Sequence, residues 1–169
     1  MVITTLHLYK QNFKFSSAHF LIFDEKSAEK LHGHNYQVEV QIEIPQGERD
    51  RDGDEDHSGK GYFVDFNVFK KWIKARLDQW DEMVLLPSQH PDMKISKKSP
   101  SLEVRFRDRF YVFPENEVCL LPITNTSVEM LSQILAKEAF QEFKKYGVKE
   151  LRIQVEETRG QAASTRVNE

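Results

Sequence analysis

A perfectly alternating stretch follows a pair of histidines in the first third of the chain. Apolar side chains occupy every second position from Tyr36 to Ile44, and polar side chains lie between them. This period of two is typical of a strand with one buried and one exposed face. His32 and His34 fall on the apolar side of the same pattern, so two imidazoles should stand about 7 Å apart at their Cα atoms. Their rings can therefore converge on one ion.

A third histidine, His19, ends an earlier segment, 13–19, that also alternates. If 13–19 pairs antiparallel with 34–44, His19 comes to the same end as the other two histidines. Three histidines without a fourth strong ligand nearby describe a zinc site with one open position, as catalytic zinc sites have. The alternative is a polar turn whose histidines are satisfied by hydrogen bonds. The shared strand face favours the metal.

Composition excludes several function classes. A length of 169 residues fits one domain or one subunit of an oligomer. The net charge of −3 gives no reason to expect nucleic acid or an anionic membrane as a partner. The single cysteine, Cys119, excludes an internal disulfide, and the start of the chain lacks the regions of a signal peptide. No apolar run approaches the roughly 18 residues of a spanning helix, so we expect a cytoplasmic protein.

The remaining patterns predict an α+β fold of order β-β-α-α-β-β, with two long helices on an antiparallel sheet. The first helix shows an apolar stripe at spacings of three and four, and the second begins near a capping box at 126–129 and stops at Gly147. The expected strands cover 2–19, 34–45, 118–123, 148–158 and 162–167, the helices cover 65–80 and about 126–147, and a polar connection covers 20–31.

Four motifs carry a resemblance. They are Phe15-x-x-Ala18-His19, Leu31-His32-Gly33-His34-Asn35-Tyr36, Val64-Asp65-Phe66 and Glu157-Thr158. In this order and spacing they resemble the 6-pyruvoyl-tetrahydropterin synthase family, which includes the 6-carboxy-tetrahydropterin synthase of queuosine synthesis. The resemblance implies zinc on His19, His32 and His34, and a reduced pterin whose side-chain hydroxyls meet the metal.

The resemblance also implies an architecture. It sharpens the fold to the tunnelling fold, a four-stranded antiparallel sheet with two long helices on one face, as a single pterin-binding domain over 1–169. Its subunits join their sheets into a trimeric barrel, and two trimers usually stack as a hexamer. Relative to that pattern the chain carries insertions at about 46–61 and 87–118. In the first insertion, Asp50-x-Asp52-x-Asp54 lacks the glycine and the final glutamate of a calcium loop, so we reject calcium there.

Strand parity selects Glu157 as the candidate that binds the substrate. It continues the apolar series of the strand at 148–158, whereas Glu156 should face solvent. A carboxylate in an apolar position is costly unless it is paired, and the N–H donors of a pterin could pair with it. The family anchors its pterin at the matching glutamate. A solvated glutamate at the strand end is the alternative. Glu129 matches another family position near the pterin, beside Ser127 at the same helix start, although a capping role fits Glu129 nearly as well.

The family pattern breaks at the catalytic residues. The cysteine of the queuosine-type enzymes falls at Ala28, and the Asp-His pair falls at Asp81-Glu82, so the histidine is missing. Cys119 cannot replace the thiolate because it lies in an apolar strand far along the chain. Some family members have a glutamate three residues before the first histidine, and they are associated with cleaving the side chain to 6-hydroxymethyl-dihydropterin. Glu29 holds that position here, so Glu29 and Asp81 are our catalytic candidates.

We therefore expect a zinc-dependent lyase that acts on 7,8-dihydroneopterin or its triphosphate by cleaving the side chain. A zinc-bound hydroxyl is acidified, and a nearby carboxylate can take its proton. Three other functions are weighed: 6-pyruvoyl or 6-carboxy product formation by a modified mechanism, a binding module whose catalysis has lapsed, and a purely structural zinc protein, which the lack of a fourth ligand disfavours. For Glu29 itself, the alternative is one charge of a solvated loop.

A further expectation concerns the second insertion. Arg105, Arg107 and Arg109 alternate, so they should share one face of a strand or hairpin over 104–113. Three guanidinium groups on one face could bind a triphosphate, although a solvated face or salt bridges between subunits would give the same pattern.

Overall fold

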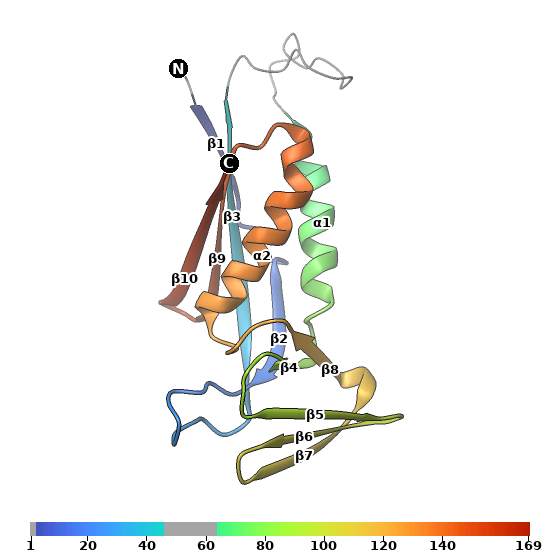
Figure 1. The fold of residues 1–169 in the computed structure, drawn as a ribbon. Helices are drawn as coiled ribbons and strands as arrows, with labels where there is room; N and C mark the ends of the chain where they lie inside the picture. The colour runs from blue at the N-terminus through green and yellow to red at the C-terminus, as the bar shows by residue number, and fades with distance from the viewer. Residues whose placement is uncertain (1–2, 46–63) are drawn as a thin grey trace.

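Two long helices lie side by side against one face of a large sheet in the computed structural model of the chain (Figure 1). The structure describes residues 3–45 and 64–169. The helices are α1 (Phe66–Asp78) and α2 (Val128–Phe143), and short 3-10 turns cover Glu115–Glu117 and Lys144–Tyr146. The strands are β1 (Ile3–Leu8), β2 (Lys14–His19), β3 (His32–Pro45), β4 (Met83–Pro87), β5 (Met93–Lys98), β6 (Ser101–Phe106), β7 (Arg109–Pro114), β8 (Val118–Leu121), β9 (Glu150–Thr158) and β10 (Gln161–Asn168).

The long strand β3 is the centre of the sheet. It pairs antiparallel with β9 on one side and with both β1 and β2 on the other. The predicted strand over 2–19 is therefore wrong in one detail, because it is broken between Leu8 and Lys14. Residues 9–13 stand opposite 38–39, and the surplus chain is taken up by a turn in which Phe13 N–H donates to the Lys10 carbonyl at 2.9 Å.

The predicted antiparallel sheet with two helices on one face is confirmed, but it has more strands than we expected. In addition to the antiparallel β-strands, β4 and β8 extend the sheet through parallel pairings, giving seven strands in all. The segment 104–113 forms a hairpin of β6 and β7, which β5 completes as a separate three-stranded sheet at one end of the molecule (Figure 1). Within the described residues the large sheet ends at β10 and β8, and the oligomeric barrel that would pair such edges stays a prediction.

Helix boundaries follow recognisable caps. The Asp65 carboxylate caps α1 by accepting from Asn67 N–H at 2.8 Å. Helix α2 is capped by Ser127, so the box predicted from Thr126 to Glu129 is shifted by one residue, and Glu129 is an exposed residue of the first turn. Gly147 ends the 3-10 turn after α2 with φ of 79°, a left-handed conformation that glycine adopts without strain.

The alternating face of β3 forms the core between the sheet and the helices. Val38, Val40 and Ile42 are completely buried and pack in one cluster with residues of both helices. A second, smaller cluster joins the three-stranded sheet to the segment after β2, through Phe20, Ile22 and their neighbours. The main core therefore determines which side chains of β3 face the helices. The smaller cluster holds the connecting segment 20–31, which leads into β3.

The 46–61 insertion with its rejected calcium loop lies outside the described residues, and the single pterin-binding domain stays a prediction. Across 3–45 and 64–169, no helix has the length and apolar character that crossing a membrane requires.

The packing of β3 predicts a large asymmetry between its two faces. Ile42→Ala should lower the free energy of unfolding by about 2–5 kcal/mol, because it leaves a cavity in a fully buried position. Gln41→Ala, the matched change on the other face, should stay within about 0.5 kcal/mol. Urea denaturation at one fixed protein concentration measures both, and equal losses would contradict the assignment of the faces.

Candidate active site

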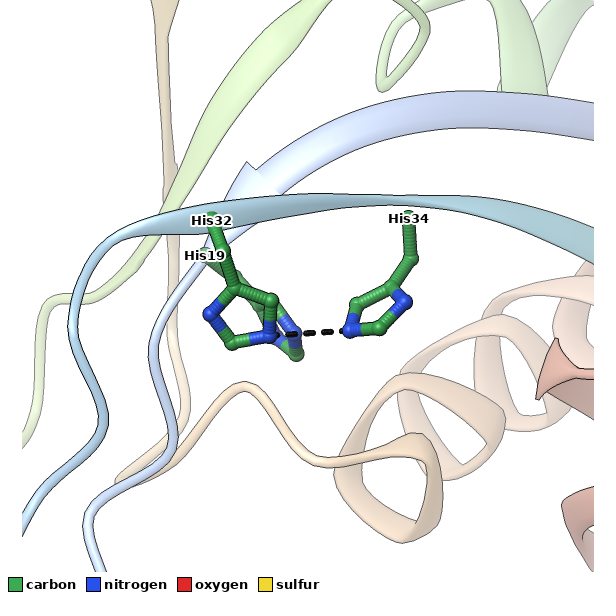
Figure 2. A group of neighbouring side chains, drawn as sticks. All are labelled: His19, His32 and His34. Carbon is green, nitrogen blue, oxygen red and sulfur yellow. Dashed lines mark hydrogen bonds between the residues drawn. The ribbon is translucent and has the colours of Figure 1, made fainter.

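Three histidines converge at the end of the sheet where β2 ends and β3 begins. His19 pairs directly opposite His32, and His34 lies two residues further along β3. One ring nitrogen from each histidine lies within 4.8 Å of the others, and the Nε2 atoms of His32 and His34 are 2.9 Å apart. Figure 2 shows the three rings directed toward one another beneath the strand. The predicted convergence of these residues is confirmed.

The opposite nitrogen of two rings faces a backbone carbonyl. His19 Nδ1 lies 3.0 Å from the Thr126 carbonyl oxygen, and His32 Nδ1 lies 2.7 Å from that of Lys30. A carbonyl only accepts, so Nδ1 carries the proton in both rings and a neutral ring keeps its lone pair on Nε2. Such an outer hydrogen bond is the usual way of orienting a metal-binding histidine. Both lone pairs are thus held toward the centre of the cluster.

The side of the histidine cluster formed by His19 and Tyr36 is shielded from solvent. His19 is completely buried, and this burial lowers its pKa, so the ring is held in its neutral form. Tyr36 is also buried, next to His19. Its burial, and to a smaller extent the negative charge of Glu157, raise the pKa of the Tyr36 hydroxyl well above the ordinary range of a tyrosine. The Tyr36 hydroxyl lies 3.2 Å from His19 Nε2 and 3.3 Å from Glu157 Oε1. His32 and His34 are only partly buried, which leaves the other side open.

Glu157 points into this cluster from β9. Its Oε1 lies 3.0 Å from His19 Nε2 and 3.6 Å from His34 Nε2. Glu156 takes the other direction, and its carboxylate accepts from Gly160 N–H at 2.7 Å in the turn before β10. The parity prediction that separates these two glutamates is confirmed, although the binding role of Glu157 stays a prediction.

Glu29 reaches the cluster from the segment between β2 and β3. Its Oε2 lies 3.6 Å from His32 Nε2 and accepts from Leu21 N–H at 3.0 Å. The carboxylate is therefore oriented by the backbone beside the histidines, and its side chain keeps 30% of its surface exposed. An undirected charge in a solvated loop would have neither contact. Ala28, the position at which the family resemblance implies a cysteine, forms a bridge to Ile22.

An open cleft of about 670 Å³ lies beside the histidines. His34 and Glu157 line it together with Asn35, Glu82 and Arg159. Its volume lies in the range of small-molecule sites. Glu82 adopts a left-handed backbone with φ of 60°, which is unusual for a residue other than glycine, and its N–H donates to the Ser16 carbonyl at 2.7 Å.

Other predicted site residues lie outside this inner group. Asp81 Oδ1 accepts from Ser16 N–H at 2.7 Å, so this carboxylate is engaged by the backbone, and within the described residues it is Glu82 that lines the cleft. Ser127 uses its hydroxyl as the cap of α2, one residue after the Thr126 carbonyl that orients His19. Cys119 is half-buried on β8 and burial raises its pKa, which agrees with the expectation of an inert thiol.

The arginine expectation is wrong. Arg107 lies in the turn between β6 and β7 with φ of 55°, so the three side chains do not share one strand face. Arg105 stacks over the ring of Phe110. Arg109 instead donates to the carbonyls of Ala28 and Glu29.

Sequence reasoning did not identify the groups that contact His19 and orient the segment beside it, namely the Tyr36 hydroxyl, the Thr126 carbonyl and the Asn125 side chain. The Tyr36 hydroxyl could have been found, because Tyr36 shares the parity of His32 and His34. The Thr126 carbonyl could not, since it lies more than a hundred residues from His19 in the chain and no local pattern marks it. The same holds for Asn125, whose side chain pairs with both the N–H and the carbonyl of Ile22, at 3.1 and 2.9 Å.

The donor set fits a zinc ion. The Nε2 atoms of His19 and His32 and a nearby carboxylate oxygen are acceptors directed at one region, to which His34 adds a third ring nitrogen, and their lone pairs repel unless a cation or shared protons lie between them. Three histidines with an accessible side are the ligands of catalytic zinc. Oxygen-preferring ions such as Mg²⁺ and Ca²⁺ are poorly matched to three imidazoles.

Comparison with known proteins agrees with this geometry. The family model described as 6-pyruvoyl tetrahydropterin synthase matches residues 8–168. A curated Methanocaldococcus jannaschii protein, provisionally named 6-carboxy-5,6,7,8-tetrahydropterin synthase, is 30% identical over 157 residues, which cover 90% of this chain and 89% of that protein.

Solved structures show the same fold. The 6-pyruvoyltetrahydropterin synthase of Plasmodium vivax has a TM-score of 0.85 at 24% identity, with all of both chains covered. A variant of it in which a catalytic residue, a glutamate, is replaced by alanine has a TM-score of 0.86 at the same identity and coverage. The Plasmodium falciparum protein has a TM-score of 0.84 at 24% identity, with 99% of both chains covered. Together with the match of the family model, these likenesses identify the architecture as the tunnelling fold, and the chain belongs to the 6-pyruvoyl tetrahydropterin synthase family.

Proposed function

We propose that the protein is a zinc-dependent lyase that cleaves the side chain of a 7,8-dihydroneopterin-type substrate to leave 6-hydroxymethyl-dihydropterin. The observation that carries this proposal is the position of Glu29. Its carboxylate lies beside His32 and is oriented by Leu21 N–H, whereas Ala28 excludes the cysteine-based mechanism of related enzymes. A glutamate is also named as a catalytic residue in the Plasmodium vivax relative.

His19, His32 and His34 would hold the metal through their Nε2 atoms. Bound there, Zn²⁺ would polarise a side-chain hydroxyl of the pterin and lower its pKa. The chain itself supplies the orientation of the ligands, because the carbonyls of Thr126 and Lys30 fix two of the three rings.

Glu29 acts as the general base in this proposal. Its Oε2 takes the proton from the hydroxyl on the second side-chain carbon, and the bond between the first and second carbons then breaks as in a retro-aldol reaction. The second carbon leaves as an aldehyde, the electron pair passes toward the pterin ring, and the first carbon gains a proton to become the hydroxymethyl group. One proton leaves and one is added, so no oxidant is needed.

Glu157 anchors the pterin in this account. Its carboxylate can accept two N–H donors from the pyrimidine edge, and such charge-assisted pairs are stronger than neutral hydrogen bonds. The buried Tyr36 hydroxyl, 3.3 Å from Oε1, keeps the carboxylate in place. Three residues outside the inner group remain candidates: Asp81 for catalysis, and Ser127 and Glu129 for substrate binding. The Asp81 carboxylate already accepts a hydrogen bond from Ser16 N–H, and the Ser127 hydroxyl already caps α2.

A second candidate is 6-carboxy-tetrahydropterin formation by a modified mechanism, which the name of the Methanocaldococcus jannaschii relative favours. In that reaction the two distal carbons of the side chain are lost but the retained carbon ends as a carboxylate. The two products differ in mass and charge, so product analysis separates them. A module that binds zinc and pterin without turnover would yield neither.

Removal of one metal ligand gives the first test of the site. His34→Ala should reduce bound zinc from about one ion per chain to a small fraction, because three-ligand sites tolerate little loss. His7→Ala, an exposed histidine on β1, should keep full zinc. Elemental analysis after dialysis measures both, and full zinc in His34→Ala would refute the ligand assignment.

The two neighbouring glutamates of β9 give a second test. Glu157→Gln should weaken pterin binding by about 1.5–3 kcal/mol, the scale of a hydrogen bond to a charged group. Glu156→Gln should leave it unchanged, because that carboxylate is engaged in the turn with Gly160. Calorimetric titration with a reduced pterin decides, and equal losses would argue against the anchor.

The base gives the third and most direct test. Glu29→Gln should keep zinc and bind the pterin but lose cleavage by about 10²–10⁴-fold, the usual contribution of a positioned base. Glu25→Gln, an exposed change in the same segment, should turn over normally. Mass spectrometry should identify 6-hydroxymethyl-dihydropterin from dihydroneopterin or its triphosphate. Normal turnover by Glu29→Gln, or a carboxy or pyruvoyl product from the wild type, would overturn the proposal.

A further inference from the structure

We propose that Arg109, on the separate three-stranded sheet, is a positioning residue that holds Glu29 in place for catalysis. The inference rests on the proposed function of Glu29. It assigns a task to the β5–β7 sheet, which otherwise stands apart from the histidines. Arg109 itself acts through the backbone, because its contacts are with carbonyl groups and aromatic rings.

The contacts of Arg109 converge on the residue before the base and on the base itself. One terminal nitrogen, Nη2, donates to the Ala28 carbonyl at 3.0 Å, and the other, Nη1, donates to the Glu29 carbonyl. The guanidinium also lies 5.8 Å from the ring centres of Phe20 and Phe106. A planar group with parallel donors fixes two successive carbonyls in one orientation, which a single flexible ammonium would do less well.

Glu29 is fixed at two further points once its carbonyl is held. Its N–H donates to the Leu21 carbonyl at 2.9 Å, and its carboxylate accepts from Leu21 N–H at 3.0 Å. A single bridge between Ile22 and Ala28 closes the segment behind this pair. The segment has no regular strand of its own, so these contacts determine where the carboxylate lies.

The small sheet supports the same segment by packing. Ile22 and Ala28 lie in the cluster that contains Val104 and Phe106 of β6. Arg107 adds a contact at the other end of the segment, where its Nη2 donates to the Asp24 carbonyl at 2.5 Å while its Nε donates to Asp92 at 2.8 Å. Figure 1 shows the segment after β2 lying along one end of β5–β7. Arg109 is the member of this group nearest to the base.

Loss of this support should affect the chemical step rather than substrate binding. A displacement of about 1 Å in a catalytic group can cost on the order of 10²-fold in rate. Arg109 is not a residue of the cleft that His34 and Glu157 line, so the affinity for the pterin should not change. The expected signature is a lower kcat with an unchanged KM.

The kinetic experiment uses the zinc-loaded full chain. Arg109→Gln should lower kcat by about 10–100-fold at unchanged KM and zinc content. Arg109→Lys, which keeps the charge and the packed stem but not the two parallel donors, should recover only part of that loss. Arg166→Gln, at an exposed arginine of β10 paired with Glu150, is the matched control and should behave as the wild type. In a Glu29→Gln background, Arg109→Gln should cause no further loss, because the two residues act as one unit.

A second measurement does not depend on turnover. Hydrogen exchange of the backbone amides of Leu21 and Glu29 should be about 10-fold faster in Arg109→Gln than in the wild type, and unchanged in Arg166→Gln. This readout separates the two proposals. A wild type without cleavage contradicts the function of Glu29, and exchange still tests whether Arg109 orders the segment.

Two results would overturn the inference. One is unchanged hydrogen exchange at Leu21 and Glu29 in Arg109→Gln, because the hydrogen bonds of Arg109 would then not order the segment that carries Glu29. The other is faster exchange with normal kcat in an active enzyme, since the order would then not serve catalysis. If Arg109→Gln does not fold, Arg109→Lys carries the same comparisons on a smaller scale. Faster exchange at Leu21 and Glu29, with a lower kcat that does not fall further in the Glu29→Gln background, is then the supporting result, and wild-type exchange overturns the inference.

Discussion

The site depends on the pairing of β2 with β3. That pairing sets His19 directly opposite His32 and leaves His34 on the same face, where the buried side chains of β3 begin. A slip of one residue would turn the two histidines of β3 to the other face together with the whole apolar series, which the core cannot accept. The same hydrophobic burial that holds the sheet to its helices therefore fixes the position of three potential metal ligands.

The convergence of these groups is costly unless a cation or shared protons lie between them. A neutral, buried imidazole, two further rings and a carboxylate meet in one region. Two carboxylates approach the cluster from different elements: Glu157 from β9 beside His19 and His34, and Glu29 from the connecting segment beside His32. In the proposed function one group holds the substrate and the other removes a proton. The first is positioned by the parity of β9, and the second by the contacts of its connecting segment.

The sequence was sufficient where a periodic pattern spans the residues concerned. The alternation of β3 predicted the side of both histidines, and the parity of β9 separated Glu157 from Glu156, as the contacts of these side chains confirm. It was insufficient where the partner is distant in the chain. Two contacts leave no local signal in the sequence: that of His19 with the Thr126 carbonyl, and that of Arg109 with the Glu29 carbonyl. Both depend on how the loop before α2 and the strand β7 pack against the site. The break between β1 and β2 does leave a local signal, since the buried positions change from even-numbered (Leu8) to odd-numbered (Phe15, Ser17) across it, and the prediction of one strand overlooked this change.

The central claim is that three imidazole nitrogens hold one zinc ion and leave a position for an exchangeable ligand. X-ray absorption spectroscopy of the zinc-loaded protein tests it most directly. The account predicts three nitrogen scatterers with the imidazole pattern at about 2.0–2.1 Å and one oxygen whose contribution changes when a pterin is added. A sulfur scatterer at about 2.3 Å, or a closed site of four protein ligands that a pterin does not alter, would contradict it.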